Sequence, residues 1–188
     1  LFGVVIPPWS SQKSAREKVR TQSALLDEIC AASEGGLRRC STSEEIRRAT
    51  DEGSIAAMIG VEGSYGLTDD MASIDVLVAA GARYHGPAHI FDSKDVKTSW
   101  RHQGGSITDR AREYVEALRE HSILVDLAHM PRTPFLEICQ SSNAPVLVSH
   151  TGFSALAPIW RNIDDEQIRA VAETGGVMGV IMTPRYLK

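Results

Sequence analysis

Four side chains that can bind a metal ion or transfer a proton follow short apolar runs of the sequence. Glu62, His89, His129 and His150 each lie at or just beyond the carboxyl end of a separate predicted strand. In a barrel these strand ends form one face, and neighbouring strands lie about 4.8 Å apart, so the four side chains can converge. Taken singly, each can also be a hydrogen-bonded polar residue at a strand end. Together they indicate a shared metal site.

The ligand set that this pattern favours is Glu62, His129 and His150. Two neutral imidazoles and one carboxylate are expected for a catalytic zinc ion, which keeps a position open for water, whereas a structural zinc ion has four protein ligands. The same ligands accept manganese or cobalt. Asp126, three residues before His129, has two interpretations: it accepts a hydrogen bond from an imidazole, or it caps the next helix.

The elements that must position these residues alternate between short apolar runs and longer amphipathic stretches, as in successive βα units. The predicted strands cover residues 2–6, 37–40, 55–61, 123–127, 146–148 and 177–182, and another starts at residues 83–84. The predicted helices cover residues 14–32, 71–80, 108–121, 133–140 and 164–174, with a short one from about 43 and a long loop at 90–106. We expect one α/β domain over residues 1–188, either a doubly wound sheet or a barrel.

Composition excludes several classes of function. The 188 residues are 43% hydrophobic, which is typical of an ordinary globular protein. The 20 basic and 24 acidic residues are interspersed, so no basic stripe indicates nucleic-acid binding. The apolar runs are far shorter than the roughly 20 residues of a membrane span. The cellular location is not decided, because the sequence opens on Leu1 inside a predicted strand and a targeting segment can precede it.

At the same residues the sequence resembles the membrane (renal) dipeptidase family, peptidase family M19. The resemblance covers about residues 55–180 and consists of ordered, spaced segments. These segments are 59–63 (IGVEG), 81–84 (GARY, leading to His89), 124–129 (LVDLAH), 148–150 (VSH) and 161–162 (RN).

The resemblance implies a TIM-like (β/α)8 barrel and a zinc-dependent dipeptidase, which hydrolyses the amide bond of a dipeptide through a hydroxide formed on zinc. It implies that Glu62 bridges two zinc ions and takes part in catalysis, and that His129 and His150 are zinc ligands. It also implies that His89 stabilises the tetrahedral intermediate and that Arg161 binds the substrate carboxylate. The residues alone equally allow Arg161 to be a surface residue near the next helix.

Two features depart from the family pattern. The family's first zinc site needs a His-x-Asp pair on the opening strand and a late Asp, and neither is present here. We therefore expect an incomplete barrel of about six βα units with its first and last parts missing, and visible ligands for only one of two zinc ions. Residues 87–90 (PAHI) replace the family's polar Thr-His-Asn, so the surroundings of His89 also differ.

Two other functions stay open at this stage. One is a related metal-dependent amidohydrolase that acts on another small amide or a lactam. The other is a non-catalytic barrel remnant that binds ligands or partners, since an open barrel exposes unpaired strand edges. The expected partner is a dipeptide, with no nucleic acid, and a homodimer is one assembly that this interpretation allows. The sequence does not determine the preferred dipeptide.

Overall fold

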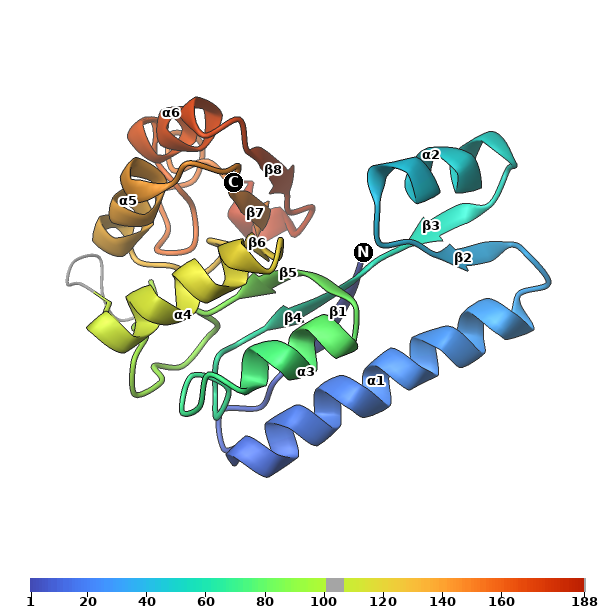
Figure 1. Ribbon diagram of the computed structural model, residues 1–188. Helices are drawn as coiled ribbons and strands as arrows, with labels where there is room; N and C mark the ends of the chain where they lie inside the picture. Colours follow the sequence, from blue (N-terminus) through green and yellow to red (C-terminus); the bar gives the residue numbers. More distant parts are fainter. Residues whose placement is uncertain (101–106, 188) are drawn as a thin grey trace.

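The computed structural model, which describes residues 1–100 and 107–187, is an α/β fold in which every strand pair is parallel (Figure 1). The strands are β1 (Phe2–Val5), β2 (Leu37–Arg39), β3 (Ile55–Ala57), β4 (Ile59–Glu62), β5 (Ala82–Gly86), β6 (Leu124–Val125), β7 (Leu147–Thr151) and β8 (Val177–Val180). The helices are α1 (Gln12–Ala32), α2 (Ser43–Asp51), α3 (Ser73–Ala79), α4 (Asp109–Glu120), α5 (Arg132–Ser141) and α6 (Asp165–Glu173), followed by the 3-10 turn η1 (Pro184–Tyr186).

The strands form three sheets and no closed barrel within the described residues. The largest sheet has the order β1-β4-β5-β6, and β2-β3 and β7-β8 form separate pairs. A single bridge between Asp126 and Leu147 connects the end of β6 to β7. The strands from β4 to β8 therefore lie side by side in chain order, as expected for successive βα units. The α/β class is confirmed, whereas the barrel is present only as partial parallel sheets.

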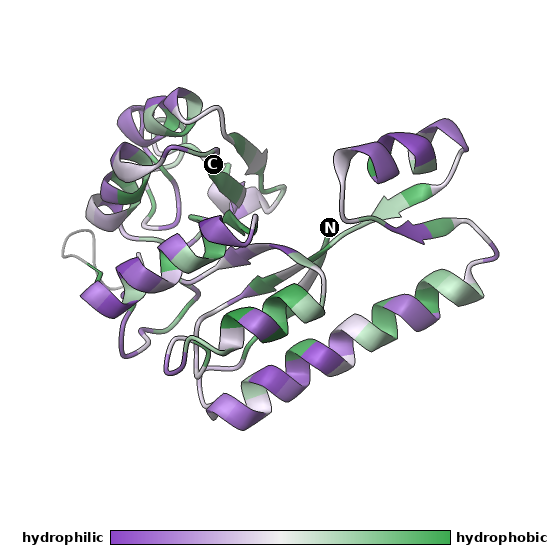
Figure 2. Cartoon of the chain, in the orientation of Figure 1, coloured by the Kyte–Doolittle hydropathy of each residue, from purple (hydrophilic) through white to green (hydrophobic). Residues whose placement is uncertain are grey.

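The helices cover the outer side of these strands. In Figure 1, α1, α3, α4, α5 and α6 follow one another around the strands, while α2 stands apart with β2 and β3. Figure 2 shows hydrophobic residues along the strands and hydrophilic residues on much of the helix surface. The core between the two layers includes the fully buried side chains of Val61, Leu77, Leu118, Leu127 and Phe135. Burial of such apolar area is the main stabilising contribution to the fold.

Several element boundaries differ from the predicted ones because distant segments decide them. The strand expected at residues 55–61 is divided, since β3 pairs with β2 whereas β4 pairs with β1. The strand expected at 123–127 is shortened to β6, and β7 continues to Thr151 instead of ending at 148. Residues 101–106 of the predicted loop, with His102, lie outside the described residues.

The N-terminus of α2 is closed by a capping box that the sequence analysis did not identify. The Thr42 hydroxyl accepts a hydrogen bond from the Glu45 backbone N–H (3.2 Å), and the Glu45 carboxylate accepts one from the Thr42 backbone N–H (3.2 Å). Replacing Thr42 with alanine is expected to lower the free energy of unfolding by about 1 kcal/mol. Thermal unfolding should then shift down by about 2–4 °C.

The matched control is Thr50→Ala at the other end of α2. Within the described residues the Thr50 hydroxyl donates only to the Ile46 carbonyl of its own helix (2.9 Å). Its loss should therefore change the free energy of unfolding little. Circular dichroism during heating measures both variants. Equal shifts in the two would contradict a stabilising role for the cap.

Candidate metal centre

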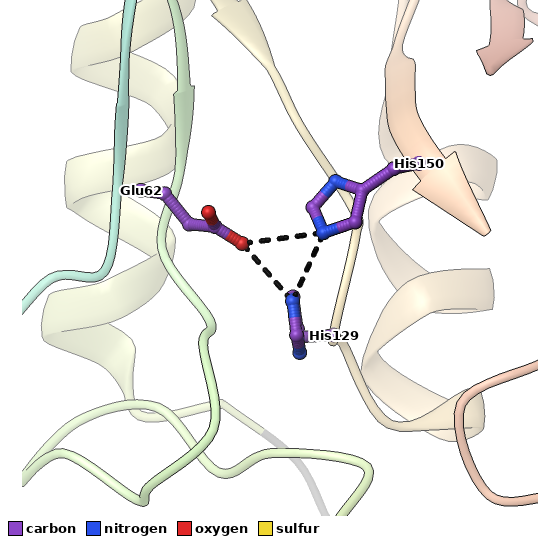
Figure 3. Close-up of side chains that lie close together, drawn as sticks. All are labelled: Glu62, His129 and His150. Atoms are coloured by element: carbon purple, nitrogen blue, oxygen red, sulfur yellow. Dashed lines mark hydrogen bonds and ion pairs between the residues drawn. The ribbon is translucent and has the colours of Figure 1, made fainter. Parts of the chain in front are cut away.

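Three side chains from separate strands point at one another at the carboxyl side of the sheet (Figure 3). Glu62 is the last residue of β4, His129 lies in the turn after β6, and His150 lies near the end of β7. Glu62 Oε1 is 3.0 Å from His129 Nε2 and 3.5 Å from His150 Nε2. The two Nε2 atoms are 3.2 Å apart. The structure thus brings together the three residues that the sequence predicted as ligands.

The spacing of these three atoms fits a bound metal ion. Ligand atoms at about 2.0–2.1 Å from a tetrahedral zinc ion lie about 3.3 Å from one another, and the three observed distances bracket that value. Glu62 Oε1 is also buried, and its close polar neighbours among the described residues are the imidazole nitrogens of the same cluster. A buried carboxylate oxygen is costly without a compensating contact, which a cation supplies. Within residues 1–100 and 107–187, no other group of His, Cys, Asp or Glu side chains has this ligand spacing.

The backbone around His129 has a conformation that is rare for a side-chain-bearing residue. His129 has a φ of 65°, in the left-handed region. The turn is fixed by hydrogen bonds from the Ala128 N–H to Asp126 Oδ1 (3.1 Å) and from the Ser99 N–H to the His129 carbonyl (2.9 Å). Strained residues of this kind persist where surrounding contacts over-determine them, often at functional sites. Here the strained turn directs the imidazole towards Glu62.

His150 is held through its ring and through its backbone carbonyl. Its Nδ1 atom is 2.8 Å from Ser149 Oγ, and its carbonyl accepts a hydrogen bond from Arg161 Nη2 at 2.6 Å. The Ser149 hydroxyl in turn donates a hydrogen bond to Asp126 Oδ2. The sequence analysis did not single out Ser149, and its position directly before His150 was the one available signal.

Asp126 matches neither of its two predicted roles. It makes no hydrogen bond to an imidazole of the described residues, and α5 begins at Arg132 with Pro131 as its N-cap residue. Instead the buried carboxylate accepts hydrogen bonds from the backbone N–H of Ala128 and from both the N–H and the hydroxyl of Ser149. Its connection to the metal centre therefore runs through a serine.

His89 and Arg161 lie beside the three-residue cluster. His89 Nε2 is 3.9 Å from Glu62 Oε1, and its ring meets that of His129 edge to face with centroids 5.0 Å apart. Arg161 is only 4% exposed, so the interpretation of it as a surface residue is wrong. Trp160, next to Arg161, packs edge to face against Trp100.

Burial and charge set the protonation of the cluster. Burial lowers the pKa of His129 to about 4, and the nearby Arg161 charge adds to this effect. Burial also lowers the pKa of His150 and that of His89. For Glu62 burial raises the pKa, but the contact with His129 and the other imidazoles outweigh it and hold the pKa below its ordinary value. Neutral imidazoles with an ionised carboxylate are the state in which these groups bind a metal ion.

The other histidines of the described chain do not join this site. His85 is fully buried in β5, where its Nδ1 is 2.9 Å from the Val61 carbonyl and burial lowers its pKa to about 4. His121 is the exposed residue that ends α4.

Comparison with known proteins gives consistent similarities. The family sequence model described as membrane dipeptidase (peptidase family M19) matches residues 1–188. An uncharacterized protein in the pqqA 5′ region of Klebsiella pneumoniae is 28% identical over 174 residues, which cover 89% of this chain and 64% of that protein. The chain thus spans less than two thirds of the length of this relative. Within the described residues, no helix has the length and apolar character required to cross a membrane.

Solved structures share the fold at low sequence identity. The dipeptidase AC, a metallopeptidase of family M19, has a TM-score of 0.90 and 20% identity, and the match covers 100% of this chain and 60% of that one. A metallopeptidase from Rhodobacter sphaeroides, liganded with a phosphinate mimic of the dipeptide L-Ala-D-Ala, has a TM-score of 0.90 and 19% identity over 100% of this chain and 62% of that one.

Proposed function

Because the chain belongs to the membrane dipeptidase family, peptidase family M19, we propose that it provides the active site of a zinc-dependent dipeptidase. The observation that carries the proposal is the convergence of Glu62 Oε1, His129 Nε2 and His150 Nε2 to within 3.5 Å of one another. The dipeptide mimic bound to the similar Rhodobacter sphaeroides protein supports the substrate class. The order of β4 to β8 and the fold similarity support a TIM-like barrel for the intact enzyme.

The chain's own residues have distinct tasks in this reaction. A divalent metal ion in this position supplies Lewis acidity, which polarises a carbonyl and lowers the pKa of water. Glu62, His129 and His150 would hold that ion. His89 is neutral at neutral pH because burial lowers its pKa, so its N–H can donate to the oxygen on which negative charge develops.

Arg161 supports a substrate with a free α-carboxylate, such as a dipeptide. One N–H of its guanidinium donates to the His150 carbonyl, and no other hydrogen bond of this group is made within the described part of the chain. The remaining N–H groups are available for a substrate carboxylate, which a planar guanidinium binds with two parallel hydrogen bonds. A dipeptide carries a free α-carboxylate on the residue that follows its scissile bond, whereas an amidated dipeptide does not.

Adding Zn2+ is expected to raise the thermal stability of the protein. A free metal concentration of 100 times Kd adds about 2.7 kcal/mol to the free energy of unfolding, or roughly 5–11 °C for a chain of this length. Differential scanning fluorimetry measures the shift, and a chelator should reverse it. The Glu137→Gln control changes an acidic residue of α5 that pairs with Arg112, so it should keep the full shift. An undiminished shift in Glu62→Gln would contradict the proposed site.

Replacing Arg161 with alanine is expected to raise KM for an unblocked dipeptide about 10- to 100-fold, because a charge-assisted hydrogen bond is lost. The amidated dipeptide lacks the carboxylate, so its KM should be similar in the wild type and in Arg161→Ala. The control is Arg169→Ala, which removes an exposed arginine of α6. Equal loss with both substrates would favour another small amide or lactam as substrate. Metal binding without hydrolysis of any dipeptide, small amide or lactam would favour a non-catalytic protein.

A further inference from the structure

A continuous chain of hydrogen bonds connects a buried carboxylate to the far side of one ligand ring. Asp126 is 1% exposed, and its Oδ1 accepts hydrogen bonds from the backbone N–H groups of Ala128 (3.1 Å) and Ser149 (2.8 Å). Its Oδ2 accepts a hydrogen bond from the Ser149 hydroxyl. Ser149 Oγ is also 2.8 Å from His150 Nδ1. These three side chains form the Asp126-Ser149-His150 relay.

The carboxylate fixes the direction of every hydrogen bond in the relay. A serine hydroxyl has a single hydrogen, and an ionised carboxylate can only accept. Burial raises the pKa of Asp126, and its hydrogen bonds from Ser149 and Ala128 act in the opposite direction and favour the ionised form. If the Ser149 hydrogen points to Asp126, Ser149 Oγ can only accept from His150. The proton of the neutral His150 ring then lies on Nδ1, and the lone pair of Nε2 is free for a metal ion held together with Glu62 Oε1 and His129 Nε2.

We propose that Ser149 is a positioning residue, which transmits the acceptor character of Asp126 to His150 and holds its ring in the Nδ1–H tautomer required for metal binding. Partners on the far side of a ligand imidazole commonly fix its tautomer in this way. The Nδ1 atom of His129 is buried without a hydrogen-bond partner among the described residues, so the relay acts on one ligand ring. The inference rests on the proposed metal centre, but the tautomer can be measured without metal.

Asp126→Asn is the sharpest test, because it reverses the relay with almost no change in shape. The two backbone N–H groups should keep the asparagine oxygen at the Oδ1 position, which places the NH2 group at the Oδ2 position. The amide then donates to Ser149 Oγ, and the Ser149 hydroxyl must donate to His150 Nδ1. The ring proton moves to Nε2, which no longer offers a lone pair. We expect this variant to bind Zn2+ about 10- to 100-fold more weakly than the wild type.

Two substitutions of Ser149 separate the hydroxyl from its surroundings. Ser149→Ala removes the relay and should weaken Zn2+ binding about 10- to 100-fold. Ser149→Thr keeps the hydroxyl and should restore most of the affinity. Ser142→Ala is the matched control, since the Ser142 hydroxyl bonds only within its own turn, to the Ala144 carbonyl. Zn2+ affinity is measured by competition with a chromophoric chelator, and thermal unfolding verifies that each variant is folded.

Nitrogen-15 NMR of the histidine rings in the metal-free protein gives the tautomer directly. A protonated Nδ1 in the wild type and a protonated Nε2 in Asp126→Asn would support the relay. A protonated Nε2 in the wild type, or Ser149→Ala binding Zn2+ as tightly as the wild type, would overturn it. If Asp126→Asn and Ser149→Ala do not fold, the wild-type spectrum still decides, because it needs no variant. A wild type with the Nδ1–H tautomer but no Zn2+ affinity would refute the metal centre and leave the relay standing.

Discussion

Replacing His129 with glycine is expected to weaken Zn2+ binding about 100- to 1000-fold. Zinc sites with four protein ligands have binding free energies of about 10–16 kcal/mol, or about 2.5–4 kcal/mol for each ligand. His129 Nε2 lies within 3.2 Å of both other ligand atoms, so its loss opens the cluster. Glycine is the suitable replacement because it adopts the φ of 65° found here without strain. The change thus removes the ligand and leaves the turn unstrained.

Chelator competition at neutral pH measures the affinity of this variant. His121→Ala is the matched control, since His121 is exposed at the end of α4 and its Nδ1 contacts only the Ala117 carbonyl of its own helix. The control should bind Zn2+ as the wild type does. Wild-type affinity in His129→Gly would show that the metal lies elsewhere or that two ligands suffice.

The metal-free protein is expected to lose stability as the pH falls from about 6.5 to about 4. Burial lowers the pKa of His85 and that of His129 from 6.5 to about 4. Between these values the unfolded chain binds protons that the folded chain does not, so acidification favours unfolding. The contribution of these histidines to the free energy of unfolding is fully present above pH 6.5. Near pH 4 it is smaller by up to roughly 3 kcal/mol for each histidine.

Urea unfolding at a series of pH values, with chelator present, tests this expectation. His85→Gln removes one of these buried titrating groups, so the free energy of unfolding should depend less steeply on pH in this window. A free energy of unfolding that stays constant or rises on acidification would show that neither imidazole is held neutral by burial.

The amino-acid sequence by itself determined the local features of this protein. The alternation of apolar runs and amphipathic stretches predicted parallel βα units, and all described strand pairs are parallel. The helices predicted from residues 108 and 164 begin there, and the side chains of Thr108 and Asp164 accept the backbone hydrogen bonds of an N-cap. Periodicity and capping depend on residues only a few positions apart, which is why one sequence suffices to predict them. The family segments around Glu62, His129 and His150 were equally visible, although the role of these residues as metal ligands stays a prediction.

Only the tertiary structure decided how distant segments meet. Residues 55–62 divide between two partner strands, Arg161 is buried behind His150, and the Ser149 hydroxyl comes between Asp126 and the ligand ring. The left-handed backbone of His129 depends on hydrogen bonds from other segments of the chain in the same way. Strand pairing, burial and side-chain hydrogen bonds across the sheet depend on which segments become neighbours, and a local sequence pattern does not contain that information.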